Sequence, residues 1–211
     1  MREKKFTLHS VAGYTMEIAI WKMLCDVCRD LTENREKIRN MFCISPGMIQ
    51  IDGEGFHIIE NSIFDEEIKR FYPPEIDKNK IVGIIFVPTS EEEENEKKIV
   101  WCLGSLVCYM SSGHYVFGGR GGEYQQRHPL VGLPVLRKEH EKLTEIVHRC
   151  MQYDPSKRVS INELRILSKK GYKKCLEDVR SFSPIEEYEN KFEQEIFTSD
   201  TNLFWPEKME G

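Results

Sequence analysis

The sequence lacks any apolar run close to the roughly 20 residues that a membrane-spanning helix requires. Residues 1–5 are mostly charged and no apolar stretch follows them, so the sequence shows no secretory signal. Basic residues are not in excess, because 30 lysines and arginines stand against 35 acidic residues. The resulting net charge of −5 disfavours a broad surface for nucleic acid. We therefore expect a cytoplasmic protein that binds no nucleic acid.

Disulfide and metal motifs are also scarce. The seven cysteines are odd in number and lie mostly among apolar neighbours, which is typical of thiols that act as small buried hydrophobic groups in a reducing compartment. Cys25 and Cys28 have the Cys-x-x-Cys spacing of zinc and redox sites. Both belong to an apolar helical stripe, and no second such motif follows. Core packing is the better interpretation, and we expect no metal and no cofactor.

Acidic residues gather towards the C-terminal end. Residues 183–211 contain eight acidic and two basic residues, a charge of −6, so residues 1–182 carry +1. Within this acidic tail, residues 202–206 form an apolar cluster that includes Phe204 and Trp205. Such a cluster either docks on its own domain or acts as a linear motif for a partner, and the sequence leaves both open. We predict a domain over residues 6–182 followed by the tail.

Hydrophobic periodicity predicts a mainly α-helical domain. A stripe at helical spacing is formed by Ile18, Trp21, Leu24, Cys25, Cys28 and Leu31. Residues 99–110 are apolar over about three turns, which favours a helix buried on most sides. Residues 138–153 form an amphipathic pattern, and Ser160 caps a shorter helix that Gly171 closes. Short strands on either side of a tight turn at residues 53–55 predict one small β-hairpin.

Four segments, in their order along the chain, resemble motifs of the protein-kinase C-lobe. Residues 44–49 lie where a kinase has its catalytic loop. The segment Tyr72-Pro73-Pro74-Glu75 resembles Ala-Pro-Glu, and Val100-Trp101-Cys102-Leu103-Gly104 resembles the Val-Trp-Ser-Leu-Gly of helix αF. Residues 150–158 resemble Leu-x-x-Asp-Pro-x-x-Arg, which precedes the last kinase helices. The resemblance covers residues 15–180 and implies a kinase C-lobe-like fold.

The resemblance implies one structural ion pair and several missing catalytic parts. In kinases the Ala-Pro-Glu glutamate pairs with the last arginine, which here gives Glu75 and Arg158. Phosphoryl transfer needs a Gly-rich loop, a lysine, a base and a metal-binding aspartate, but about 15 residues precede the first predicted helix, too few for an N-lobe. His-Arg-Asp aligns with residues 41–43, and Asp-Phe-Gly with residues 60–62, where Glu60 alone keeps a carboxylate. We therefore expect no catalytic residue and no enzyme activity.

A family with this deficit is the KIND domain, the kinase non-catalytic C-lobe domain, which the chain also resembles near its start. These domains open with a Ser-Leu stretch, then a glutamate and a tryptophan that lead a helix, and residues 7–11 and 17–21 are similar. KIND domains of Spir actin nucleators and FERM-and-PDZ phosphatases bind peptide segments of partners, such as a basic formin tail. The stretch between Glu75 and Trp101 is longer here and contains an acidic run. We therefore expect a different partner-facing surface.

Three further patterns have both a functional and a plain interpretation. The acidic run Glu91, Glu92, Glu93 and Glu94 can receive a basic peptide, although a solvated linker is the commoner role of such a run. Residues 118–122 are glycine-rich but lack the P-loop pattern, so a surface loop is favoured over a phosphate site. His114 and His128 have no neighbouring carboxylate and nucleophile in the sequence, so we expect them on the surface.

Together, these features predict a non-catalytic adaptor that binds a peptide segment, with a basic partner among cytoskeletal or signalling regulators. The candidate partner-binding residues are the acidic run and the pair Phe204 and Trp205. One alternative is a divergent nucleotide-binding regulator that uses Glu60 for a metal, which Mg²⁺–nucleotide binding would favour. Another is a decoy that mimics a kinase C-lobe and occupies the partners of a kinase, which co-purification with such a partner would favour.

Overall fold

The structure, a computed structural model, describes residues 6–11, 13, 15–59, 66–76 and 92–182. Its α-helices are α1 (Glu17–Glu33), α2 (Arg35–Asn40), α3 (Glu92–Ser112), α4 (Gly122–Arg127), α5 (Glu141–Cys150) and α6 (Ile161–Phe182). Short 3₁₀ turns span Leu8–Val11, Pro46–Met48, Glu66–Phe71, Val116–Gly119, Lys138–His140 and Pro155–Lys157. Strands β2 (Ile49–Asp52) and β3 (Gly55–Ile58) form an antiparallel hairpin, and β1 (Phe6–Thr7) pairs with the other edge of β2. The predicted mainly helical fold with a hairpin is confirmed, and no described helix is long and apolar enough to cross a membrane.

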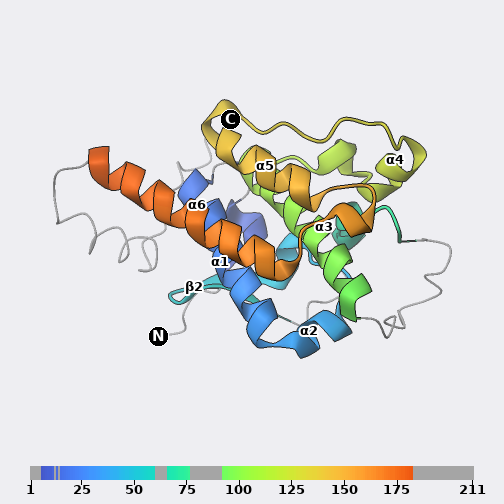
Figure 1. Cartoon of the computed structure of the whole chain (residues 1–211), viewed down its shortest axis with the longest axis horizontal. Helices are drawn as coiled ribbons and strands as arrows, with labels where there is room; N and C mark the ends of the chain where they lie inside the picture. Colours follow the sequence, from blue (N-terminus) through green and yellow to red (C-terminus); the bar gives the residue numbers. More distant parts are fainter. Residues whose placement is uncertain (1–5, 12, 14, 60–65, 77–91, 183–211) are drawn as a thin grey trace, which may run out of the picture.

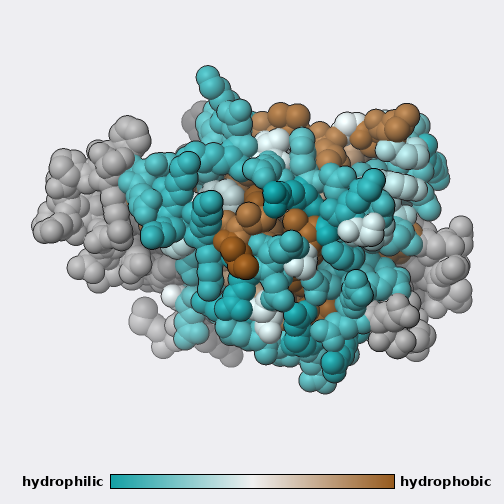
Figure 2. Space-filling view, viewed as in Figure 1, coloured by the Kyte–Doolittle hydropathy of each residue, from teal (hydrophilic) through white to brown (hydrophobic). Residues whose placement is uncertain are grey.

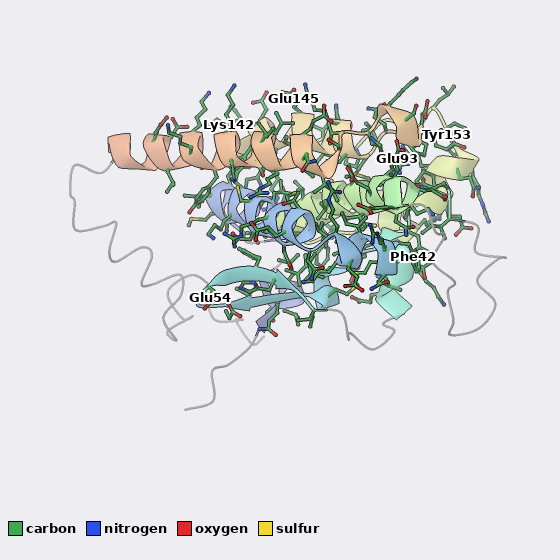
Figure 3. The ribbon with its side chains drawn as sticks, turned by 60° about the horizontal axis from the view of Figure 1, so that its bottom comes forward. Phe42, Glu54, Glu93, Lys142, Glu145 and Tyr153 are labelled. Carbon is green, nitrogen blue, oxygen red and sulfur yellow. The ribbon has the colours of Figure 1, made fainter. Side chains whose placement is uncertain are left out.

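Helix α1 crosses the domain beside α6 (Figure 1). Figure 3 shows α6 on one side of α1 and α3, and the hairpin on the other side. The apolar stripe of α1 is buried, as its spacing predicts, and includes Trp21, Leu24 and Leu31. At the contact with α6, a Cβ placed on Gly171 would lie 2.6 Å from the ring of Trp21. The two helices therefore approach closely because a glycine lies between them.

The predicted end of the last helix at Gly171 is wrong. The beginning of α6 agrees with the sequence, because Ser160 Oγ accepts from the N–H of Glu163 and the Glu163 carboxylate accepts from the N–H of Ser160. The helix then continues through Gly171 to Phe182. A glycine inside a helix usually costs about 0.5–1 kcal/mol relative to alanine. Here it is required by the ring of Trp21, so Gly171 is a packing position and not a helix end.

Helix α3 forms the centre of the core. Residues 98–111 are all buried, which agrees with the burial predicted for the apolar run. A Cβ on Gly104 would lie 2.7 Å from the side chain of Met151, so this glycine permits the close approach of the segment that ends α5. The helix begins at Glu92, so Glu92, Glu93 and Glu94 of the acidic run lie in its first turn. Carboxylates at the N-terminus of a helix are favourable because they face the positive end of its dipole.

Carboxylates of α1 cover the outer edge of the hairpin. Asp26 accepts a hydrogen bond of 3.2 Å from the N–H of Phe56, and Asp30 accepts one of 3.2 Å from the N–H of Ile58. The side chain of Asp26 is buried, and Lys22 balances its charge at 2.8 Å. An open strand edge presents unpaired backbone groups, and here the helix satisfies two of them. The hairpin is therefore fixed to α1 by polar contacts as well as by packing.

Helix α4 begins against the backbone of residues 72–75. The N–H of Gly122 donates to the carbonyl of Tyr72 at 2.7 Å. The preceding Gly121 has a φ of +55°, in the left-handed region that favours glycine. A Cβ on Gly122 would lie 2.2 Å from the nitrogen of Pro74. These two glycines let the chain pass close to residues 72–75, and this contact sets the position of α4.

We expect Gly122→Ala to destabilise the domain even though alanine is the better helix former. The added methyl group would overlap the backbone at Pro74, and overpacking of this kind typically costs about 1–3 kcal/mol. Gly132→Ala is the matched control, because a Cβ there meets no atom within 4 Å. Urea unfolding measures both changes. Equal unfolding free energies for the two variants would show that α4 is not held by this contact.

Candidate functional site

The segment that aligns with the kinase catalytic motif is buried. In residues 41–43, Met41 and Cys43 belong to the core. The Cys43 Sγ lies 3.6 Å from the carbonyl oxygen of Phe71 and 3.4 Å from the Sγ of Cys102. Burial is the main cause that raises the pKa of the Cys43 thiol well above its ordinary value, and the nearby Cys102 raises it further. A thiol in this state is a core side chain, not an accessible base or nucleophile.

Glu75 and Arg158 form the ion pair expected from the resemblance. Arg158 donates from Nη1 to Glu75 Oε1 at 2.6 Å and from Nη2 to Oε2 at 2.8 Å. The Arg158 side chain has no exposed surface, whereas that of Glu75 is 21% exposed. The remaining guanidinium N–H groups donate to the carbonyls of Lys97, Gln152 and Tyr153. All five donors of the buried arginine are therefore satisfied, and the pair is structural.

The acidic run is largely used within the chain. Glu92 lies 2.9 Å from Arg39 Nε, and Glu94 lies 2.6 Å from Lys98 Nζ. Glu93 is exposed at the start of α3 (Figure 3). Glu91, the other predicted member of this set, lies outside the described residues. Within the described run, two of three carboxylates thus have basic neighbours of their own, which reduces what the run offers to a basic peptide.

The other predicted partner-binding residues, Phe204 and Trp205, lie outside the described part of the chain, as does Glu60. The two histidines are exposed as expected, His114 after α3 and His128 at the end of α4. Of the glycine-rich residues 118–122, Gly118 and Arg120 are exposed in the turn before α4, as a surface loop predicts, whereas Gly121 and Gly122 are buried against the backbone of residues 72–75. Sequence-based candidates therefore do not converge on one place in the described structure.

A surface that the sequence analysis missed lies between α4 and α5. Residues 129–136 connect these helices without forming a helix or a strand, and we call this segment the apolar strap. Figure 2 shows hydrophobic atoms along the upper edge of the molecule, where Figure 1 draws this connection. Leu130 is 99% exposed and Val135 is 81% exposed. Leu133 and Leu136 are partly buried against the core, so Leu130 and Val135 are the large apolar side chains that the strap exposes. Exposed apolar side chains of this size make the strap a candidate interaction surface.

Three aromatic rings precede the strap in the chain. The ring of Tyr124 on α4 stacks on Phe117 with centroids 5.6 Å apart, and the tilted ring of His128, directly before the strap, lies 4.5 Å from that of Tyr124. The guanidinium of Arg120 lies 5.5 Å from the Tyr124 centroid. Phe117 has a φ of +51°, a conformation that costs an ordinary residue about 1–2 kcal/mol. Strained residues of this kind gather at ligand-binding sites, so the geometry of Phe117 adds to the case for this surface.

We define the α4–strap surface as Phe117, Arg120, Tyr124, His128 and residues 129–136. Residues 117–139 contain four basic and two acidic residues, a net charge of +2. Glu123 and Arg127 pair with each other at 2.6 Å, which leaves Arg120, Arg137 and Lys138 against Glu139. The surface thus offers apolar and aromatic contacts with a basic rim. The sequence signal for this surface was the hydrophobicity of residues 129–136, which is high for a surface connection between helices.

No model of a known protein family matches the chain, and no curated protein is found to be similar to it. Function must therefore be inferred from the geometry of the described residues. In that geometry Arg158 is buried and fully hydrogen-bonded, Met41 and Cys43 lie in the core, and the strap exposes Leu130 and Val135.

We expect Glu75→Gln to lower the free energy of unfolding by roughly 3–5 kcal/mol, because the buried charge of Arg158 loses its counter-ion. Glu145→Gln is the control, since Glu145 is a 73% exposed partner of Arg149 on α5 (Figure 3). An exposed pair of this type contributes at most about 1 kcal/mol. Urea unfolding compares the two variants. Similar losses in both would show that the Glu75–Arg158 pair is no stronger than a surface ion pair.

Thiol alkylation tests the burial of the segment at residues 41–43. Burial raises the pKa of Cys108 and Cys150 to about 12 and that of Cys43 well above its ordinary value, so their thiolates are scarce at pH 8. We expect iodoacetamide to label the half-buried Cys25 and Cys175 first. The Cys43 label should appear only on unfolding, as read by peptide mass spectrometry. Native labelling of Cys43 as fast as that of Cys175 would contradict the buried arrangement.

Proposed function

We propose that this chain is a non-catalytic protein-binding domain with a kinase C-lobe-like fold of the KIND type. Two segments that resemble kinase motifs support the fold assignment, because they meet across 83 residues in the Glu75–Arg158 pair. The Val-Trp-x-Leu-Gly segment supports it as well, since it lies in the buried helix α3, as the corresponding kinase segment does. The chain is an adaptor whose task is to hold a partner segment.

Adaptor function is favoured over phosphoryl transfer by the surroundings of residues 41–43. A catalytic base must reach the proton that it removes, at roughly 2.6–3.2 Å in a substrate complex. Cys43 instead lies against the backbone carbonyl of Phe71 and the thiol of Cys102, inside the core. The nucleotide-binding alternative depends on Glu60, which lies outside the described residues, so no described contact supports it.

The exposure of the apolar strap is the observation that carries the binding proposal. Leu130 and Val135 extend almost fully into water at either end of the strap. Full burial of a leucine or valine side chain contributes about 1.5–3 kcal/mol, so covering this segment is a strong driving force for association. The aromatic cluster of Phe117, Tyr124 and His128 precedes the strap in the chain, and aromatic side chains frequently dominate binding energy.

The chemistry of the surface also indicates the class of partner. The basic rim around the strap favours a segment that places acidic residues beside apolar or aromatic anchors. This differs from the basic partner that the sequence suggested through Glu91–Glu94. Glu92 and Glu94 already lie against Arg39 and Lys98. We therefore propose an acidic, apolar peptide segment of another protein as the ligand of the α4–strap surface.

Quantitative affinity purification tests the proposed function. We expect the double variant Leu130→Ser/Val135→Ser to lose most of the partner recovered by the unchanged chain. Because both side chains are exposed, the substitutions should leave unfolding within about 0.5 kcal/mol of the unchanged chain. Ile166→Ser, on the exposed face of α6, is the matched control and should keep the partner. Partner recovery that is equal in all three chains would overturn the assignment of the surface.

The same chains also test the nucleotide-binding alternative. Mg²⁺–ATP should leave the thermal unfolding midpoint of the full chain unchanged, because a ligand that does not bind the folded state cannot stabilise it. A rise in the midpoint that depends on nucleotide concentration would favour the regulator over the adaptor.

A further inference from the structure

We propose that the acidic tail of the same chain covers the α4–strap surface, with Leu203, Phe204 and Trp205 as its apolar anchors. In this proposal the tail competes with the partner segment for the same surface, and that regulatory role rests on the proposed function. The contact between the tail and the surface does not require a partner, so it can be tested without one.

The chemistry of the tail matches that of the ligand that the surface requires. The tail carries a charge of −6, and its apolar cluster at residues 202–206 is flanked by Asp200 and Glu207. The rim of the α4–strap surface carries +2 over residues 117–139. Acidic residues beside aromatic anchors would thus meet basic residues beside exposed apolar side chains. Phe204 and Trp205 also suit the neighbouring rings of Tyr124 and His128, because aromatic pairs contribute about 0.5–1.5 kcal/mol beyond their burial.

The tail is long enough to make this contact. Helix α6 ends at Phe182, on the side of the molecule away from α4 (Figure 1). Between Phe182 and Phe204 lie 22 residue steps, which span at most roughly 75 Å. A compact domain of about 180 residues has a radius of gyration of roughly 16 Å and a diameter of roughly 40 Å. The anchors can therefore reach the strap from the end of α6.

Charge, and the covalent connection of the tail to the domain, favour the tail over a second copy of the chain as the occupant of the surface. Two copies that met through their α4–strap surfaces would bring two rims of +2 together, which is unfavourable. A tail on the same chain brings opposite charges together. Because the tail belongs to the same chain, its effective concentration at the surface is roughly millimolar. A modest intrinsic affinity is therefore enough for the tail to occupy the surface. The surface is then covered until a partner segment of higher affinity displaces the tail.

The tryptophans of the chain provide a direct readout. The sequence contains three, and two of them, Trp21 and Trp101, are core residues with 4% and 0% exposure. Acrylamide quenching of tryptophan fluorescence in the full chain therefore reports mainly on Trp205. The chain with Trp205→Phe supplies the background of the two buried tryptophans. Subtracting it isolates the quenching of Trp205.

We expect Trp205 to be protected in the unchanged chain. In Leu130→Ser/Val135→Ser its quenching constant should rise several-fold, as it should in Phe204→Ser. Ile166→Ser is the matched control, because it removes an exposed apolar side chain of α6, and it should leave quenching unchanged. High salt should raise the quenching of the unchanged chain, because salt screens the attraction between the acidic residues of the tail and the basic residues near the strap.

Two results would overturn the proposal. The first is equal quenching of Trp205 in the unchanged chain and in the strap variant, which would mean that the tail is not on this surface. The second is protection that disappears on dilution from roughly 10 to 0.1 µM, which by mass action would identify a second copy as the occupant. Either result leaves the affinity-purification test of the proposed function intact, so the two proposals can fail separately.

Discussion

The guanidinium of Arg158 is a charge that the domain has removed from water, and the surrounding chain is arranged to satisfy it. A buried charge is tolerated when it is paired and hydrogen-bonded on every donor. Here the five donors are shared between the Glu75 carboxylate and three backbone carbonyls. The carbonyls belong to the start of α3 and to the turn before α6. One side chain thus joins three segments that are remote in sequence.

The candidate site depends on that arrangement through a short series of contacts. Glu75 fixes the segment at residues 72–75, and the carbonyl of Tyr72 in this segment accepts from the N–H of Gly122. Gly122 begins α4, which carries Tyr124 and leads into the strap. The apolar surface is therefore presented by a connection whose first anchor is the buried arginine. Phe117, Leu133 and Leu136 pack against the core, whereas Leu130 and Val135 point into water and are free to serve binding.

Sequence patterns predicted the helices well where one face or the whole circumference is apolar. The stripe of α1 and the continuous run of α3 are such cases, as is the hairpin, because a Gly-Glu-Gly turn between apolar strands has few alternatives. The Glu75–Arg158 pair was expected from a resemblance of motifs, since nothing in the spacing of two residues 83 apart predicts their contact. Gly171 was misjudged because a glycine that ends a helix and one that admits a neighbouring ring look the same in sequence.

The site was harder to predict than the fold. The acidic run stands out as a row of charges, yet its partners Arg35 and Arg39 come from α2, about 55 residues earlier, and only the fold brings them together. The strap has the opposite property. Its apolar residues suggest core, and only the fold shows that Leu130 and Val135 lie in water. Exposure is a property of the whole packing and not of the local pattern.

In-cell photo-crosslinking from a benzophenone amino acid at position 130 shows whether the α4–strap surface holds a peptide segment, with the same group at position 166 on α6 as the reference. Position 130 should crosslink to discrete acidic segments, in a partner or in residues 200–207 of the same chain, while position 166 should not. Crosslinks from position 166 alone, or none from position 130, would show that the surface holds no such segment.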